Sequence, residues 1–79
     1  MKPFAINSVF EYDGHSYLIT NRVKEGRYII CDVMRIVENV KEWETLLKHP
    51  GQFLHRVSLK RLQQFKKKGY IYNIRPAQN

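Results

Sequence analysis

The first half of the chain alternates apolar residues with turn residues in a pattern that predicts antiparallel strands. Over residues 8–20, Asp13-Gly14 separates two short runs of aromatic and β-branched residues. A two-residue type I′ turn needs positive φ at both central positions, which Asp and Gly tolerate, so we predict a β-hairpin. A second turn is expected at Glu25-Gly26, before a strand in residues 27–37. Both faces of that strand are largely apolar, which is typical of a central strand buried at least in part on both sides.

Asp32 places a carboxylate inside this predicted strand. No partner motif accompanies it, so a structural role is favoured over a functional site. We expect the carboxylate to bind Arg22, Arg27 or Arg35 across the sheet, or to lie at the rim of the sheet.

The first of two predicted helices begins after Asn39, which has Glu42 at the acidic position of a capping box, and ends at His49-Pro50-Gly51. Its apolar side chains fall on one helical face: Val40, Trp43, Leu46 and Leu47. We expect Trp43 to anchor the core. Base stacking is the alternative, but two flanking glutamates would repel phosphate.

The second helix is predicted to begin after Ser58, a good N-cap, and to end at Gly69, a natural C′ residue. Between the helices, residues 52–57 are expected to form a short extended segment, and residues 70–74 alternate as a final strand. Three apolar residues recur along the second helix and predict a narrow buried stripe: Leu59, Leu62 and Phe65.

These elements predict an α+β fold. We expect a small curled antiparallel sheet, made of a three-strand meander plus a C-terminal strand, packed with two short helices. Residues 1–79 are expected to form a single small basic domain, because the chain is too short for two cores.

The distribution of charge along the chain gives the first indication of function. The net charge is +7, yet residues 1–40 carry five charges of each sign, so the whole excess lies in residues 41–79. The stretch from His55 to Arg75 contains no Asp or Glu. This asymmetry favours a polyanionic partner, although small domains also carry surplus charge for solubility alone.

Within this stretch, lysines and arginines would contact phosphates, and Gln63 and Gln64 could reach base edges if the second helix enters a major groove. Tyr70 and Tyr72 could stack on bases, but the core is the favoured place for at least one of them. The candidate nucleic-acid-binding residues are Arg56, Lys60, Arg61, Gln64, Lys66, Lys67, Lys68, Tyr70, Tyr72 and Arg75.

Catalytic and metal-site patterns are missing from the sequence. Cys31 is the single cysteine, and with His15, His49 and His55 it shows no zinc-ligand spacing. No glycine-rich phosphate loop or carboxylate pair is evident, so we expect no enzyme activity, no cofactor and no small-molecule substrate. Secretory and membrane-spanning patterns are also missing, and a large apolar helix face for membrane binding is lacking, so we expect a cytoplasmic protein.

The order of signals resembles the small N-terminal module of transposase B subunits from Mu-like and heteromeric transposons. That module carries the pattern N-x-V-F-x-x-D-G-x-x-Y-R-I-L, followed by a short L-x-x-L helix that closes on glycine. Here the matching segments are Ile6–Gly14, Tyr17-Leu18-Ile19, Val57-Ser58-Leu59 with Leu62, and Gly69-Tyr70-Ile71. Leu18 stands where arginine is usual, and the Trp43 helix has no counterpart.

The resemblance implies a DNA-binding or assembly role inside a transposition complex, with the catalytic carboxylates in a later domain. If the chain is complete at Asn79, it is expected to be a free-standing phage or mobile-element protein. We therefore expect a non-catalytic nucleic-acid-binding module, with DNA favoured over RNA and a protein partner possible in a larger assembly. The alternative is a small protein-interaction module, such as a phage-type inhibitor or adaptor that binds an acidic protein surface.

Overall fold

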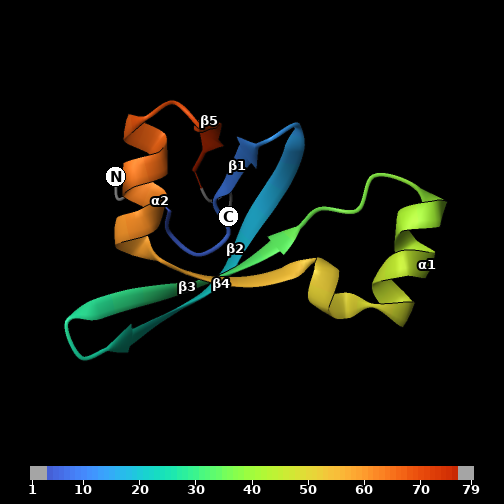
Figure 1. Cartoon of the computed structure of the whole chain (residues 1–79), viewed down its shortest axis with the longest axis horizontal. Coiled ribbons are helices and arrows are strands. Elements are labelled where there is room, and N and C mark those ends of the chain that lie inside the picture. Colours follow the sequence, from blue (N-terminus) through green and yellow to red (C-terminus); the bar gives the residue numbers. More distant parts are fainter. Residues whose placement is uncertain (1–3, 77–79) are drawn as a thin grey trace.

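A computed structural model describes residues 4–76, so the first three and last three residues of the predicted domain lie outside the description. Five antiparallel strands form one open sheet in the order β4-β3-β2-β1-β5 (Figure 1). The α+β prediction is confirmed. In chain order the elements are β1 Val9–Tyr12, β2 His15–Glu25, β3 Tyr28–Arg35, α1 Val40–Lys48, the 3-10 helix η1 Pro50–Gln52, β4 Leu54–Ser58, α2 Leu59–Lys67 and β5 Ile71–Arg75.

Two tight turns shape the meander. Asp13 and Gly14 have φ of 51° and 78°, the positive values of a type I′ turn, and they join β1 to β2 as predicted. The second turn lies at Gly26-Arg27, one residue later than expected, because β2 continues through Glu25. Gly26 has φ of 60° at the first central position, where a type II′ turn requires glycine.

A bulge in β2 curls the sheet. Ile19 pairs with Val33 and Asn21 pairs with Asp32, so Thr20 is an extra residue on β2. Its hydroxyl donates to the carbonyl oxygen of Asp32 over 3.2 Å. Because a bulge bends its strand and increases local twist, the two halves of the long β2 strand lie in different directions. The central strand is β2, whereas β3 is an interior strand next to it.

The core lies on the concave face of the sheet, which α2 covers and which we call the inner face (Figure 1). The predicted stripe on α2 is confirmed, with Leu62 buried and Leu59 and Phe65 packed against the core. On β3 only this face is buried, through Cys31 and Val33, so the expected two-sided burial is partial. The sequence patterns gave no sign of Phe4, which is fully buried and meets Phe10 edge-on.

Both ends of α2 are fixed by hydrogen bonds. The Ser58 hydroxyl accepts from the Arg61 amide over 3.2 Å, which confirms the predicted N-cap. At the other end, the Gly69 amide donates to Lys66 O over 3.0 Å and the Tyr70 amide donates to Phe65 O over 2.9 Å. These two bonds form a Schellman motif, with Gly69 in the left-handed conformation at φ 81°. The helix is therefore held at a fixed position on the sheet.

Helix α1 has the expected cap but not the expected burial. The Asn39 side chain accepts from the Glu42 amide over 2.9 Å, as predicted. However, α1 lies beyond the end of the sheet and packs only against η1 among the described elements (Figure 1). Trp43 is 55% exposed, so its predicted role as a core anchor is wrong. Amphipathic spacing shows which side of a helix is apolar, but it does not show whether the sheet lies within reach of that side.

Phe53, directly after η1, is a buried aromatic residue near this end of the sheet. Its ring is fully buried, and the Arg35 guanidinium lies 4.3 Å from the ring centre. Arg35 also forms an ion pair with Glu42 of α1 at 3.7 Å, and its amide donates to Phe53 O over 2.8 Å. These contacts connect the end of β3 to α1 and η1. The short extended segment expected in residues 52–57 is the strand β4, which pairs with β3.

Candidate nucleic-acid interface

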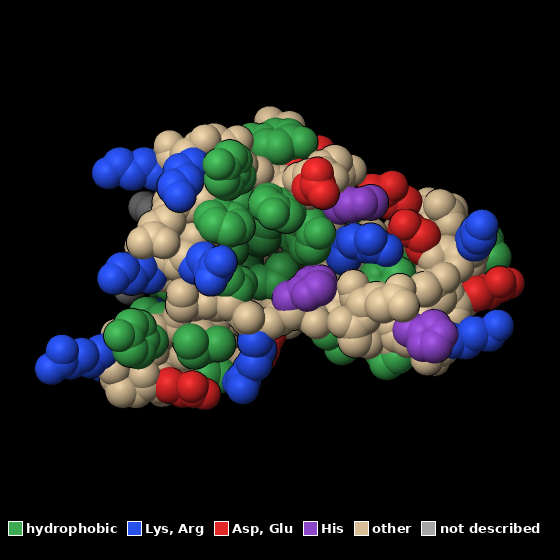
Figure 2. Space-filling model, viewed as in Figure 1, with side chains coloured by type: hydrophobic (Ala, Val, Ile, Leu, Met, Phe, Trp, Pro, Cys, Tyr) green, Lys and Arg blue, Asp and Glu red, His purple; other side chains and the backbone are tan. Residues whose placement is uncertain are grey.

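The exposed side of α2 is polar and cationic. At about 100° per residue, Lys60, Gln64 and Lys67 lie opposite the buried Leu62, and all three are exposed. Figure 2 shows Lys and Arg side chains along the side of the molecule where α2 and the tip of the β2–β3 hairpin lie. Because α2 is capped at both ends, these charges are presented from a rigid element rather than from a loose tail.

The tip of the β2–β3 hairpin extends this cationic surface. Arg27 and Tyr28 from the tip and Lys60 and Gln63 from α2 line one open hollow of about 330 Å³. Of the described residues that line it, none is acidic. The flank of α2 that bears Gln63 therefore faces the hairpin, and two chain segments more than thirty residues apart share one basic surface.

Two further cations of the hairpin point to the same side. Arg22 pairs with Cys31 and Lys24 pairs with Ile29, so both side chains lie on the inner face, the side that α2 covers. Sequence reasoning missed these residues because acids balance the bases in the first half of the chain. The register with β3 puts Glu25 and Asp32 on the opposite face of the sheet from Arg22 and Lys24, and Tyr28, which pairs with Glu25, also lines the hollow.

The predicted binding residues do not all share one surface. Lys60, Arg61, Gln64, Lys66, Lys67 and Lys68 are brought together on α2 and its C-cap. Arg56 lies on the outer face of β4, where its Nε donates to Asp32 Oδ1 over 3.0 Å. The expected structural role of Asp32 is thus confirmed, but its partner is none of the three arginines that were named.

Tyr72 and Arg75 also lie on the outer face, on β5, because they pair with Glu11 and Val9 of β1. Tyr72 is 44% exposed and Tyr70 is 54% exposed, so the expectation that at least one fills the core is wrong. Asn73 explains why the side chains of β5 do not alternate regularly between the two faces of the sheet. It has φ of 50° at a register shift in β5 and donates to Glu11 over 2.5 Å, which interrupts the alternation.

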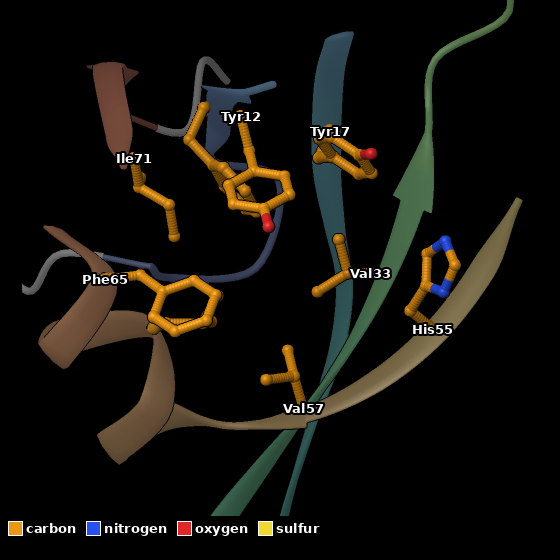
Figure 3. A pocket seen from close by; sticks show the side chains of 9 residues that line it. Tyr12, Tyr17, Val33, His55, Val57, Phe65 and Ile71 are labelled. Atoms are coloured by element: carbon orange, nitrogen blue, oxygen red, sulfur yellow. The ribbon is translucent and has the colours of Figure 1, made fainter. Parts of the chain in front are cut away.

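The opposite flank of α2 borders an apolar groove of about 210 Å³ (Figure 3). Rings of Tyr12, Tyr17, Phe65 and His55 line it, together with aliphatic side chains that include Val57. The Tyr12 and Phe65 rings are stacked at 5.8 Å, and the Arg61 guanidinium lies 5.6 Å from the Phe65 ring centre. The groove is therefore aromatic and nearly uncharged, with one arginine at its edge.

Burial affects two titratable groups on the inner face. It raises the pKa of the Cys31 thiol, an effect that the nearby Arg22 charge opposes in part. It also raises the pKa of the Tyr17 hydroxyl, against the opposing charge of Arg35. Within residues 4–76, no three His, Cys, Asp or Glu side chains converge as a metal site would require. No helix in the described part of the chain is long and apolar enough to cross a membrane.

Comparisons with protein-family models, with curated proteins and with solved structures find no match to this chain. A functional assignment therefore depends on the geometry of the surfaces described above.

Proposed function

We propose that this domain is a non-catalytic module that binds nucleic acid, and DNA in particular, through phosphate contacts. The observation that carries the proposal is the shared hollow between Arg27 of the hairpin and Lys60 of α2. We call the surface around it the basic face, made of Arg22, Lys24, Arg27, Lys60, Gln63, Gln64 and Lys67.

Phosphate binding suits this surface for an electrostatic reason. Each lysine or arginine that neutralises a phosphate releases condensed counterions, and the gain is lost as salt concentration rises. Cations on a fixed helix and a fixed hairpin can match the spacing of a nucleic-acid backbone without first becoming ordered. An acid-free hollow also avoids the repulsion that a carboxylate would impose on phosphate.

Duplex DNA is the preferred partner for two reasons. A helix fits the major groove of B-DNA, and Gln63 and Gln64 on the exposed side of α2 carry the amide groups that read adenine there. The resemblance to the transposase module also favours DNA, in a transposition complex of a mobile element or phage. Arg56, Tyr72 and Arg75 are left out of the proposed interface because they face the other side of the sheet.

Fluorescence anisotropy with a labelled DNA duplex, its single strand and an RNA hairpin, each at two salt concentrations, tests the proposal. We expect the tightest binding to the duplex and a steep loss of affinity at the higher salt concentration. Arg27→Gln should weaken binding to the duplex, whereas Lys48→Gln on α1 removes the same charge and should not. The proposal is wrong if no nucleic acid binds at low salt, or if the two variants behave alike.

A further inference from the structure

The sheet ends at β4, which pairs with β3 and with no other strand among the described residues. The backbone amide and carbonyl groups along the other side of an edge strand are free to pair with an added strand. Within β4, His55 and Val57 line the apolar groove, whereas Ser58 at the end of the strand lines the basic hollow, so the edge beside His55 and Val57 is the part next to the groove.

Side chains from the same strand form a wall of the apolar groove. His55 and Val57 pair with Val33 and Cys31, so they lie on the inner face, and both project from β4 into the groove (Figure 3). A strand added beside β4 would place every second side chain on this same face. Those side chains would meet His55, Val57 and Phe65, a lining that suits aliphatic or aromatic groups.

The intervening side chains of an added strand would meet a positive charge. Arg56 lies on the outer face of β4 and is 60% exposed at its side chain, and only its Nε is bonded to Asp32. Its two terminal nitrogens can therefore donate to a further carboxylate across the strand pair. Arg61 adds a second cation at the edge of the groove.

Together these features favour a peptide over a nucleobase as the occupant. A base carries several donors and acceptors at its edge, and the groove offers few partners for them, so entry would leave polar groups without hydrogen bonds. We propose that the free edge of β4 and the adjoining groove bind an extended segment of a partner protein whose side chains alternate between apolar and acidic. The apolar side chains enter the groove, the acidic ones face Arg56, and the segment extends the sheet by one strand.

The peptide EVDLDVE is a suitable probe, because its apolar residues share one face of a strand and its acids share the other. Its control, DEVLVED, has the same composition and charge but breaks the alternation. Titrations are followed by ¹H–¹⁵N correlation spectra of the whole chain. We expect shifts at His55, Val57 and Phe65, and about tenfold tighter binding of the alternating peptide.

Two variants separate groove binding from general attraction between opposite charges. His55→Glu puts a carboxylate into the groove at an exposed position that the fold does not need, and it should weaken the alternating peptide about tenfold. Lys48→Gln lowers the charge on α1 instead and should leave the peptide affinity unchanged. Equal binding of both peptides, equal effects of both variants, or shifts confined to the lysines of α2 would overturn the proposal. A seven-residue oligothymidylate that shifted the groove amides would also overturn it, in favour of a nucleobase.

Discussion

Arg56 donates its Nε–H to Asp32 Oδ1 over 3.0 Å, and this pair joins β4 to β3 on the outer face of the sheet. Arg56 thus belongs to the basic stretch of the sequence but not to the basic face of the molecule. The same pair sits beside the open edge of the sheet, with the arginine more exposed than the aspartate. Arg56 and the lysines of α2 belong to one basic stretch of the sequence, but they lie on two different surfaces of the molecule.

Arg56→Gln should therefore leave the affinity for duplex DNA close to that of the charge-matched Lys48→Gln variant. Its effect on the free energy of unfolding should be below about 1 kcal/mol, because a solvent-exposed ion pair contributes little. Anisotropy and urea denaturation measure the two quantities. A loss of DNA affinity well beyond that of Lys48→Gln would return Arg56 to the interface.

Exposure predicts opposite outcomes for two aromatic residues near α1. Phe53→Ala should lower the free energy of unfolding by about 3–5 kcal/mol, because the ring is fully buried. Trp43→Ala should change it by less than about 1 kcal/mol, since the indole is 55% exposed on a helix away from the sheet. Urea denaturation of both variants checks this contrast, and comparable losses would mean that Trp43 is buried in solution.

Substitution of two glycines by alanine tests the Schellman motif at the C-terminal end of α2. Gly69→Ala should destabilise the fold by about 1–2 kcal/mol, because alanine resists the left-handed conformation that Gly69 adopts at φ 81°. Gly51→Ala in η1 should be close to neutral, because Gly51 has no positive φ and a methyl group there would meet nothing within 4 Å. Thermal unfolding compares the two, and equal midpoints would argue against the Schellman motif.

Stability should fall as pH rises above the ordinary thiol pKa of about 8.5. Burial raises the pKa of Cys31 in the folded chain, so at that pH the unfolded chain releases the thiol proton while the folded chain keeps it. Tyr17 adds a second fall at higher pH for the same reason. Urea midpoints across this range should decline less steeply for Tyr17→Phe above the ordinary tyrosine pKa of about 10. An unchanged slope would contradict a raised pKa of the Tyr17 hydroxyl.

The sequence was sufficient to predict those turns and helix ends that depend on interactions between neighbouring residues. Asp13-Gly14 determines its turn through backbone conformation, and Ser58 and Gly69 determine the ends of α2 through hydrogen bonds to nearby residues. The partners of those elements depend on contacts between distant segments. The position of β4 at the edge of the sheet depends on its pairing with β3, and the exposure of Trp43 follows from where α1 lies relative to the sheet.

For the candidate site too, some residues could be predicted from the sequence and others depend on contacts between distant segments. The lysines of α2 could be found from the sequence because no acid interrupts the stretch that contains them. Arg27 could not, because Glu25 balances it in the chain and only the packing of α2 beside the hairpin tip brings Arg27 to the same hollow as Lys60. The apolar groove was also missed, since it is lined by residues from six different elements.

The salt dependence of duplex binding tests the central claim most directly. Lys60→Gln/Lys67→Gln removes two charges from the basic face, and Lys41→Gln/Lys48→Gln removes two from α1. The account predicts that the slope of log K against log salt concentration becomes shallower by about 2 in the first variant and stays unchanged in the second. Equal slopes for both variants and the unaltered chain would contradict the claim that the lysines of α2 contact phosphate.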